Sequence, residues 1–307
     1  MKIGFIGVGL MGQHMVRHML DGKHEVFIHD IDKSVCKKAI QLGAVYFESP
    51  GELSNICEVL FTSLPTPSAV ENVMLGEKGI INSALHELTY FDLGTTDPDT
   101  LFRISTKAQG KGITVLDAPV SGGTLGAEKG NLCLMIGGSY SHFEKYKHIL
   151  QLIGDNILYC GPLGSGAVCK IANNLIGMSL CVLLSEAFTV GIKSGVPPEI
   201  LYDAISASTG NTRQMHSFPE SLFAGNFEPG FKLDLATKDL KLATDMGRHL
   251  NVPMPFANLV HQKFIEGQNS DLGNQAAISI AKLIEKQCRI QIRTNNLDGT
   301  TKNNKNG

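Results

Sequence analysis

The chain has 307 residues, 43% of them hydrophobic, and a formal net charge of −2. Its 27 Lys and Arg are balanced by 29 Asp and Glu, which excludes the strongly basic character typical of nucleic-acid or anionic-membrane binding. We therefore expect no nucleic-acid and no membrane partner. The length allows a large hydrophobic core divided between about two domains.

The seven cysteines are scattered along the chain without a Cys-x-x-Cys pair. In a chain of this length such a set is typical of reduced intracellular thiols, not of a disulfide framework. Because a strand is predicted from Lys2 onwards, we expect no signal peptide. The longest apolar run, Leu175 to Leu184, is about half the length of a membrane span. These features predict a cytoplasmic protein.

The first thirty residues contain the strongest functional signal. A short apolar strand is predicted at residues 2–7, a helix at 10–21 and a second strand at 24–29. A Gly-x-Gly-x-x-Gly turn lies between the first strand and the helix. This order of strand, glycine turn, helix and strand is typical of a dinucleotide-binding fold, although a glycine-rich turn also occurs in other α/β proteins.

Each glycine of the turn has a separate role in that interpretation. Gly7 permits the tight turn, Gly9 lets the backbone approach a pyrophosphate, and Gly12 lets the helix pack closely against the strand. The helix N-terminus then directs its N–H groups at the anion. Asp30 follows Gly12 by 18 residues, where a carboxylate can accept hydrogen bonds from an adenosine ribose.

Strands and helices continue to alternate through the first half of the chain. This alternation favours a mainly parallel sheet with helices on both faces. The further predicted strands are 58–63, 88–92, 113–117, 132–136 and 156–159, and the further predicted helices are 33–42, 67–75, 97–110 and 141–152.

The second half shows only helical periodicity. One helix without proline runs from Ser165 to about Ser194 and is apolar nearly all round, so we expect it to be buried, either in the core or between subunits. Shorter helices are predicted at 197–207, 214–224, 233–250, 254–267 and 274–286.

The predicted fold class is therefore α/β, with an N-terminal doubly wound Rossmann sheet and a C-terminal all-α domain joined by the long helix. We expect a dinucleotide-binding domain at residues 1–163 and an all-helical domain at 164–293. The tail, 294–307, has almost no apolar residues and is predicted to be disordered.

Three loops after predicted strands contain candidate site residues. Leu64 and Pro65 lie in a proline-stiffened loop, and Thr95 precedes residues that can cap the helix after Pro98. In the third loop, Ser121 precedes Gly122 and Gly123. A hydroxyl beside consecutive unhindered N–H groups can bind a carboxylate, although paired glycines also occur in ordinary turns.

The start of the long helix carries the candidate proton-transfer group. Lys170 and Asn174 are four residues apart and share one helix face, next to Asn173. Such polar groups are costly on an otherwise apolar helix unless they are paired or functional. Burial also lowers the pKa of a lysine, which suits proton transfer near neutral pH. The alternative is a lysine that extends to solvent from the first turns.

The sequence resembles the β-hydroxyacid dehydrogenases from residue 1 to about 290. The resemblance depends on four motifs that occur in family order: Gly7-Val8-Gly9-Leu10-Met11-Gly12, Asp117-Ala118-Pro119-Val120-Ser121-Gly122-Gly123, Gly166-Ala167-Val168-Cys169-Lys170-Ile171-Ala172-Asn173-Asn174, and Lys238-Asp239-Leu240. It implies an NAD-binding Rossmann domain at 1–163, joined by a long helix to an all-α substrate and dimerisation domain at 164–293, and assembly as a homodimer or homotetramer.

The resemblance also implies residue roles. Lys170 corresponds to the catalytic lysine. The implied substrate-carboxylate site comprises Ser121, Gly122, Gly123, Asn173 and Asn174. The implied cofactor contacts are Gly7, Gly9, Leu10, Met11, Gly12, Asp30, Leu64, Pro65, Thr95, Phe231 and Lys238. Lys238 can otherwise pair with Asp234 on a helix surface.

Some positions depart from the family pattern. Gly94 replaces a serine common beside the threonine, and Ala69 replaces an asparagine of the Leu-Pro loop. Members that favour NADP often carry an arginine after the acid, where this chain has Ile31. Because Asp30 repels a 2′-phosphate and no guanidinium offsets it, NAD is expected over NADP.

The implied reaction is hydride transfer between NAD and a small 3-hydroxy acid or its semialdehyde, as in 3-hydroxyisobutyrate dehydrogenase, with Lys170 as general acid and base. Tartronate, succinic or sulfonated semialdehyde reduction is the alternative within the family. A catalytically idle dinucleotide-binding module is the non-enzyme alternative, and imine reduction is disfavoured by Lys170. His14 and His18 lack a third metal ligand, so no metal is expected. Arg213 either binds a second anionic group or lies in solvent.

Overall fold

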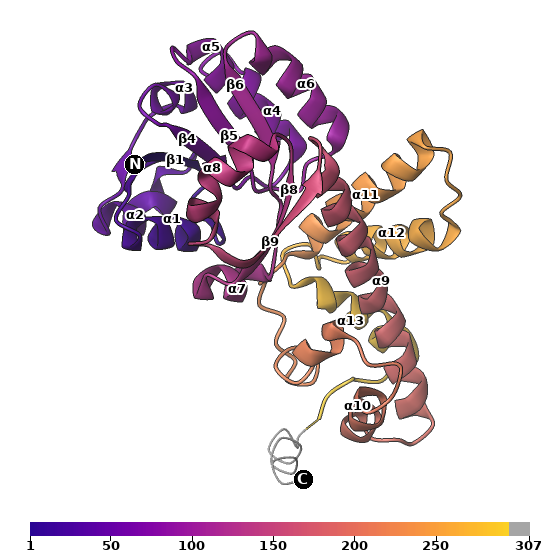
Figure 1. The fold of residues 1–307 in the computed structure, drawn as a ribbon. Coiled ribbons are helices and arrows are strands. Elements are labelled where there is room, and N and C mark those ends of the chain that lie inside the picture. The colour runs from indigo at the N-terminus through magenta and orange to yellow at the C-terminus, as the bar shows by residue number, and fades with distance from the viewer. Residues whose placement is uncertain (295–307) are drawn as a thin grey trace. The chain divides into compact units, whose positions relative to one another are not determined.

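The computed structural model describes residues 1–294, and it divides into two compact units, Met1–Ala172 and Asn173 onwards. Figure 1 shows the elements of both units. The boundary falls inside helix α9 (Ser165–Lys193), nine residues beyond the predicted domain boundary at 163. The predicted disordered tail lies, from residue 295 on, outside the described residues.

The first unit is built on one mainly parallel sheet. Its strands pair in the order β3-β2-β1-β4-β5-β6-β8-β7, with β9 on β8. Only the β6–β8 and β7–β8 pairs among these are antiparallel. The strands are β1 Lys2–Ile6, β2 Glu25–His29, β3 Val45–Tyr46, β4 Val59–Thr62, β5 Leu88–Asp92, β6 Ile113–Asp117, β7 Val120–Ser121, β8 Leu132–Gly137 and β9 Gly154–Gly161.

Helices cover both faces of this sheet because its central strands are buried on both faces. Phe5, Phe61 and Phe91 stack across β1, β4 and β5 in one cluster, while Leu60 and Tyr90 belong to a second. Helices α1, α7 and α8 contribute to the first cluster and α3 to α6 to the second. The helices are α1 Gly12–Asp21, α2 Lys37–Gln41, α3 Pro50–Ser54, α4 Pro67–Leu75, α5 Ile80–Ser83, α6 Pro98–Gln109, α7 Gly123–Lys129 and α8 Tyr140–Leu150, with the 3₁₀ turn η1 Lys33–Cys36.

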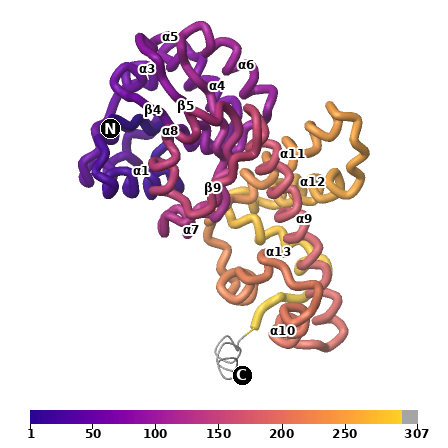
Figure 2. The backbone as a smooth tube through the Cα atoms, viewed as in Figure 1, coloured from indigo at the N-terminus to yellow at the C-terminus, as the bar shows by residue number. Residues whose placement is uncertain are grey.

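The second unit contains helices and 3₁₀ turns around its own core. Buried residues of α9 and α11, such as Phe188 and Leu240, belong to that core together with Phe218 and Phe264. Figure 2 shows α9 as one unbroken helix. The other elements are α10 Pro198–Ser206, η2 Arg213–Ser217, α11 Leu233–His249, α12 Pro255–Gln268, η3 Ala277–Ile280 and α13 Ala281–Cys288.

The predicted fold class is confirmed, and the seven predicted strands match β1, β2, β4, β5, β6, β8 and β9. The predicted helix at 214–224 is wrong, because only η2 and further turns form there. Pro219 lacks an N–H and interrupts a helix at this point. The turns instead place Phe218, Leu222 and Phe223 in the core.

The composition of α9 predicts a helix that is buried all round, but this prediction is wrong, because only one side of it is buried. One stripe is buried, including Ile171, Asn174, Cys181 and Phe188, whereas the opposite side is exposed. By length and composition α9 could cross a membrane, and only 33% of its most apolar window is buried. The estimate from the run Leu175 to Leu184 misses this, because Asn174 and Ser185 bound that run, whereas apolar residues continue on α9 beyond both.

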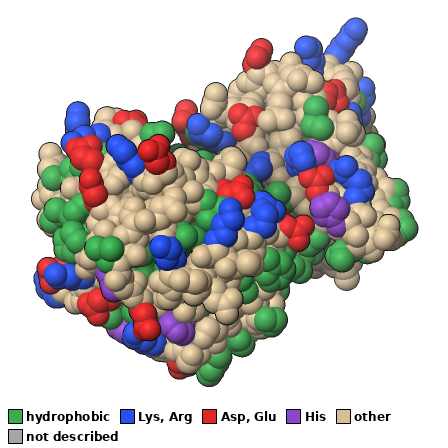
Figure 3. All heavy atoms as spheres, turned by 90° about the horizontal axis from the view of Figure 1, so that it is seen from above, with side chains coloured by type: hydrophobic (Ala, Val, Ile, Leu, Met, Phe, Trp, Pro, Cys, Tyr) green, Lys and Arg blue, Asp and Glu red, His purple; other side chains and the backbone are tan. Residues whose placement is uncertain are grey.

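Charges of both signs are mixed on the surface. On the face that Figure 3 shows, Lys and Arg side chains lie among Asp and Glu side chains and hydrophobic patches. Ion pairs near the surface include Lys33 with Glu48 at 2.7 Å and Lys241 with Asp245 at 2.5 Å.

Candidate active site

The carboxyl ends of four strands form the framework of the site. The sheet register aligns Ile6 with Thr62, Thr62 with Asp92, and Asp92 with Asp117. The strand order reverses between β1 and β4, and ligands of open α/β sheets bind in the crevice outside that point. The predicted cofactor loops follow these strand ends directly, so the topology brings them to one edge of the sheet.

The glycine turn has the backbone that the sequence predicts. Gly7 has φ +93°, and a Cβ there would collide with the carbonyl oxygen of Ser63 on the next loop. A Cβ at Gly12 would collide with the carbonyl oxygen of Gly7, so only glycine lets α1 begin this close to β1. Around Gly9, by contrast, a Cβ would have no neighbour within 4 Å. The turn is therefore closely packed at Gly7 and Gly12 and open at Gly9, as a backbone binding site for a pyrophosphate requires.

Asp30 fixes the end of β2 against this turn. Its Oδ2 accepts a hydrogen bond from the Val8 N–H at 2.7 Å, and its Oδ1 accepts one from the Asp32 N–H at 3.0 Å. A carboxylate has about four acceptor sites, so ribose hydroxyls can still be bound. The next side chain, Ile31, is 98% exposed, and Leu10 on the turn is 54% exposed. These residues fit the adenosine half of a dinucleotide.

A buried carboxylate organises the loop that contains Thr95. Asp92 accepts hydrogen bonds from Thr62 Oγ1 at 3.0 Å, the Gly94 N–H at 3.1 Å and Thr96 Oγ1 at 2.5 Å. Asp97 caps α6 by accepting a hydrogen bond from the Thr100 N–H, which confirms the prediction that a residue after Thr95 caps this helix. Thr95 is half-buried and lies between Gly94 and Thr96, which are both hydrogen-bonded to Asp92.

Close packing explains why Gly94 stands where the family often has serine. A Cβ at Gly94 would lie 3.0 Å from the Leu64 carbonyl oxygen and 3.1 Å from Asp92 Oδ1. The Leu64-Pro65 loop and the Thr95 loop therefore approach each other closely at this position. Leu64 is half-buried and Pro65 exposed, and Thr66 after them caps α4.

The predicted carboxylate site lies at the turn from β7 into α7. Ser121 is half-buried, and Gly122 and Gly123 have φ +136° and +65°. Side chains rarely adopt this left-handed backbone, so the pair is required by the turn itself. A Cβ at Gly123 would have no neighbour within 4 Å, which leaves its backbone accessible.

Asp117 clamps the start of α9 to the sheet. Its two oxygens accept hydrogen bonds from the Gly164 and Ala167 N–H groups, both at 2.7 Å. Burial raises the pKa of this carboxyl, and the two N–H bonds oppose that effect. Gly166 packs so closely that a Cβ would collide with the Met135 carbonyl oxygen. Lys170 lies one turn further along α9 and is only 9% exposed, so it does not extend to solvent.

The second unit holds a buried polar network around Asn174. Its Nδ2 donates to Asp239 Oδ2 at 2.5 Å, and its Oδ1 accepts from Asn173 Nδ2 at 3.1 Å. Lys238 Nζ lies 2.9 Å from Asp239 Oδ1, and Asp239 is 1% exposed. Asn174 is thus held in one orientation, one turn from Lys170 on the same helix.

Three acids of this arrangement were not among the predicted site residues. Asp117 and Asp239 lie within two of the family motifs, and Asp92 ends the strand before the Thr95 loop, but none of the three was predicted as a site residue. The sequence signal that could have identified them is an acid close to a predicted site residue, as Asp239 is to Lys238. Phe231, a predicted cofactor contact, is half-buried just before α11, and its backbone carbonyl oxygen accepts a hydrogen bond from the Ala277 N–H at 2.9 Å.

Two further sequence candidates have ordinary surroundings. His18 Nε2 lies 3.1 Å from the Ala127 carbonyl oxygen and 3.0 Å from that of Glu128. No group of three His, Cys, Asp or Glu residues among residues 1–294 could hold a metal ion. Arg213 begins η2 with an exposed side chain, and its neighbour Gln214 donates to Cys181 Sγ at 3.2 Å.

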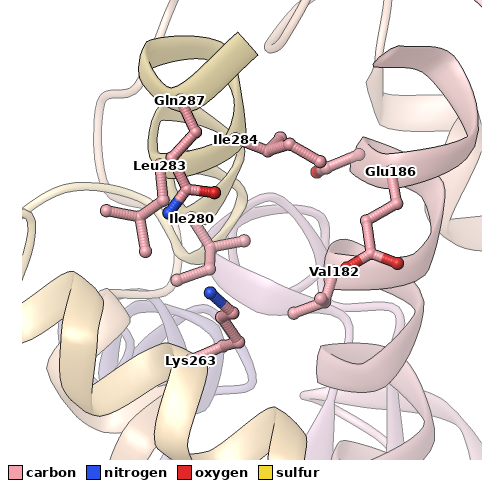
Figure 4. A pocket seen from close by; sticks show the side chains of 8 residues that line it. Val182, Glu186, Lys263, Ile280, Leu283, Ile284 and Gln287 are labelled. Atoms are coloured by element: carbon pink, nitrogen blue, oxygen red, sulfur yellow. The ribbon is translucent and has the colours of Figure 1, made fainter. Parts of the chain in front are cut away.

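A small pocket of about 40 Å³ lies elsewhere, among α9, α12 and the η3–α13 segment. Figure 4 shows the Lys263 side chain pointing into it and Glu186 at its rim. Lys263 also contacts Glu266 at 2.8 Å. The lining residues are Val182, Ser185, Glu186, Lys263, Ile280, Leu283, Ile284 and Gln287. None of them is a predicted site residue.

Comparisons with known proteins agree with this arrangement. Residues 2–161 match the model of the NAD-binding domain of 6-phosphogluconate dehydrogenase. Residues 164–284 match the model described as NAD-binding of NADP-dependent 3-hydroxyisobutyrate dehydrogenase. Both units are therefore accounted for by families of nicotinamide-dependent enzymes.

Individual relatives cover nearly the whole chain. The 2-(hydroxymethyl)glutarate dehydrogenase of Eubacterium barkeri is 34% identical over 95% of this chain and 97% of its own length. The 2-hydroxy-3-oxopropionate reductase of Escherichia coli is 33% identical over 83% of this chain and 87% of its own. The solved 3-hydroxyisobutyrate dehydrogenase of Mycobacterium tuberculosis, with L-serine, has a TM-score of 0.85 at 26% identity and covers 92% of this chain and 98% of its own.

A Rossmann sheet with a dinucleotide turn, followed by a long helix bearing a buried lysine, defines a nicotinamide-dependent oxidoreductase that acts on CH–OH groups. The chain belongs to the β-hydroxyacid dehydrogenase family.

Proposed function

We propose that this chain interconverts a small 3-hydroxy acid and its semialdehyde, with Lys170 as general acid and base. The observation that carries the proposal is the burial of Lys170 on a helix whose first turn Asp117 ties to the carboxyl edge of the sheet. A lysine buried on an otherwise apolar helix is costly unless it is paired or functional, and proton transfer is the function that suits its position.

Each residue then has a defined task. When bound, the nicotinamide accepts or supplies the hydride. Lys170, as a neutral amine, removes the proton from the substrate hydroxyl during oxidation, and its ammonium returns the proton during reduction. Asn174, held by Asp239 and Asn173, keeps the substrate oxygen and the amine in register. Phe231 and Lys238 are proposed as further cofactor contacts.

The substrate class follows from two features. Ser121, Gly122 and Gly123 offer a hydroxyl and accessible N–H groups, which suit a carboxylate. The relatives are named for 3-hydroxyisobutyrate, 2-(hydroxymethyl)glutarate and 2-hydroxy-3-oxopropionate. Each of these compounds has a carboxylate separated by one carbon from the carbinol or aldehyde carbon. A site that binds the carboxylate therefore fixes the reacting carbon, which can remove several kcal/mol of barrier.

An initial-rate screen tests the proposal. The purified chain is assayed with NAD and 3-hydroxyisobutyrate, 2-(hydroxymethyl)glutarate, glycerate, 4-hydroxybutyrate and a C3 hydroxysulfonate, and with the matching aldehydes and NADH. We expect turnover of at least one 3-hydroxy carboxylate and none of the same compound as its methyl ester. Saturable NAD binding without turnover of any compound would instead indicate an idle dinucleotide-binding module.

NAD is the proposed cofactor in preference to NADP. A 2′-phosphate beside the Asp30 carboxylate would meet a like charge, and the adjacent Ile31 offers no donor. We expect kcat/KM to favour NAD by about a hundredfold, since such a charge conflict costs a few kcal/mol. Asp30→Ser combined with Ile31→Arg should reverse the preference, with Ile200→Arg on exposed α10 as the control. Equal kcat/KM values for the two cofactors in the unaltered chain would refute this assignment.

Self-association through α9 is proposed for the oligomeric state, as a homodimer or homotetramer. Ile176, Leu183 and Val190 are 63%, 50% and 67% exposed and recur every seven residues, the spacing of a helix–helix seam. Glu186 on the same helix and Lys263 on α12 line one pocket and carry opposite charges. In a two-fold dimer, Glu186 of one copy can pair with Lys263 of the other. A second copy of this chain therefore suits the face better than a lipid surface.

Light scattering tests this interface. Leu183→Glu would bury an unpaired charge, so we expect it to weaken self-association by about a hundredfold or more. Ile200→Glu, at an equally exposed apolar site on α10, is the matched control and should leave the oligomer intact. A monomeric parent chain, or an unchanged Leu183→Glu oligomer, would rule the interface out.

We propose the cytoplasm as the location, since the seven thiols of the sequence are all free cysteines. Cell fractionation with an antibody to the chain tests this directly, and recovery with organelles or membranes would overturn it.

A further inference from the structure

An ion pair lies beside Asp30, the residue proposed to bind the adenosine ribose. Lys33 follows Asp30 by three residues and begins the turn η1. Its Nζ lies 2.7 Å from Glu48 Oε1 and 4.4 Å from the ring centre of Tyr46. The Lys33 side chain therefore reaches from the segment after β2 to the end of β3. Neither Lys33 nor Glu48 has a role in the proposed function.

The strand register places Glu48 next to Asp30. Strands β2 and β3 pair in parallel, with Ile28 opposite Tyr46. The pairing continues past Tyr46, because the Phe47 N–H donates to the Ile28 carbonyl oxygen at 2.8 Å. Asp30 and Glu48 each come two residues after the paired positions, and adjacent strands lie about 4.8 Å apart. Two acids therefore follow neighbouring strands at the same edge of the sheet.

The charges around Tyr46 agree with this placement. Burial raises the pKa of the Tyr46 hydroxyl, and the negative charge of Glu48 raises it further. The positive charge of Lys33 opposes that effect, while Asp30 adds to it. Such interactions weaken with distance, so all three charges lie around one aromatic ring. Asp30 brings the proposed ribose hydroxyls to the same place.

This arrangement bears on how a substituent at the ribose 2′ position is received. A lysine beside the ribose is a suitable partner for a 2′-phosphate, since an ammonium is a common phosphate ligand. Here the Lys33 amine is already paired with Glu48, and its place over the Tyr46 ring stabilises it further. To bind a phosphate, the amine would have to leave both partners. The Glu48 carboxylate would then remain as a second like charge close to Asp30.

We propose that Glu48 is a second cofactor-specificity residue, which pairs with Lys33 and so keeps that lysine from binding the 2′-phosphate of NADP. The inference rests on the proposed NAD site at Asp30. NAD has a 2′-hydroxyl, which requires no cation, so the ion pair does not hinder its binding. Removing the Glu48 charge should free the Lys33 amine for a 2′-phosphate even while Asp30 remains. The expected gain is about fivefold, the upper end of what one exposed charge pair contributes.

Fluorescence titration with NADH and NADPH tests this without any turnover. The two compounds differ only in the 2′-phosphate, so the ratio of their Kd values isolates its contribution. Ionic strength is held constant because salt screens exposed charges. The parent chain should bind NADH more tightly. Glu48→Gln should tighten NADPH binding about fivefold and change the Kd of NADH by less than about twofold.

A double variant separates the freed amine from the lost carboxylate. Glu48→Gln combined with Lys33→Met should return the Kd ratio to within about twofold of that of the parent chain, since the freed amine is gone. Glu144→Gln on α8, which breaks a comparable exposed pair with Lys147, is the matched control and should leave both Kd values unchanged.

Three results would overturn the inference. The first is an unchanged Kd ratio in Glu48→Gln while the parent chain binds NADH, which leaves the proposed cofactor intact. The second is an equal gain for NADPH in the double variant, which would show that Lys33 takes no part. The third is a parent chain that binds neither NADH nor NADPH, and only this result also contradicts the proposed function.

Discussion

Lys170→Ala is expected to lower kcat by about two to four decades, the usual contribution of a positioned general acid or base. Its affinity for NAD should remain largely unchanged, because the glycine turn and Asp30 are distant in the chain and keep their own hydrogen bonds. Steady-state kinetics gives kcat, and fluorescence titration gives the Kd for the cofactor.

Two controls separate proton transfer from structural damage. Lys193→Ala removes an exposed lysine near the other end of the same helix and should leave kcat within about twofold, as expected for a surface change. Small primary amines added to Lys170→Ala should restore part of the rate, because they can replace the missing base. Near-normal turnover of Lys170→Ala would contradict the role assigned to this amine.

Asp117→Ala is expected to lower the free energy of unfolding by about 3 kcal/mol. The substitution leaves the N–H groups of Gly164 and Ala167 without their acceptor, and bonds to a charged group are worth about 1.5–3 kcal/mol each. Because these bonds hold the first turn of α9, turnover should fall as well. Urea unfolding followed by circular dichroism measures the first effect.

Asp117→Asn keeps one acceptor oxygen and should lose less stability than Asp117→Ala. Burial raises the pKa of Asp117 in the folded state, so the folded chain binds this proton more tightly than the unfolded chain. The contribution of Asp117 to stability therefore falls as pH rises from the unfolded value near 3.8 through the folded pKa. Asp117→Asn should lack this dependence. Equal unfolding free energies for the parent chain and Asp117→Ala would show that the clamp contributes nothing.

The sheet and the glycine turn were predictable because local patterns specify them. Short apolar runs bounded by turn residues give strands, and a glycine at a positive φ or at a close approach cannot be replaced, as at Gly7 and Gly12. The two-residue strands β3 and β7 and the one-turn helix α5 are too short to leave a periodic signal. The predicted helix at 214–224 is the opposite kind of error. The apolar residues there have helical spacing, but the segment around Pro219 forms turns.

The acids that organise the site could not be predicted in the same way. Asp92, Asp117 and Asp239 are each 1% exposed, and each has a partner on another element: Thr62 on β4 for Asp92, Ala167 on α9 for Asp117 and Asn174 on α9 for Asp239. Burial of a carboxylate is a property of the packed fold, and no local pattern encodes it. Sequence motifs therefore indicate candidate ligand contacts, whereas the residues that hold those candidates in place are found only in the packed fold.

A crystal structure of the chain with NAD and a non-reacting 3-hydroxy acid analogue tests the central claim most directly. We expect Lys170 Nζ within about 3 Å of the oxygen on the reacting carbon, a normal hydrogen-bond distance, or joined to it by one water. A Lys170 amine well beyond that distance, with no water between, would contradict its role as the proton-transfer group.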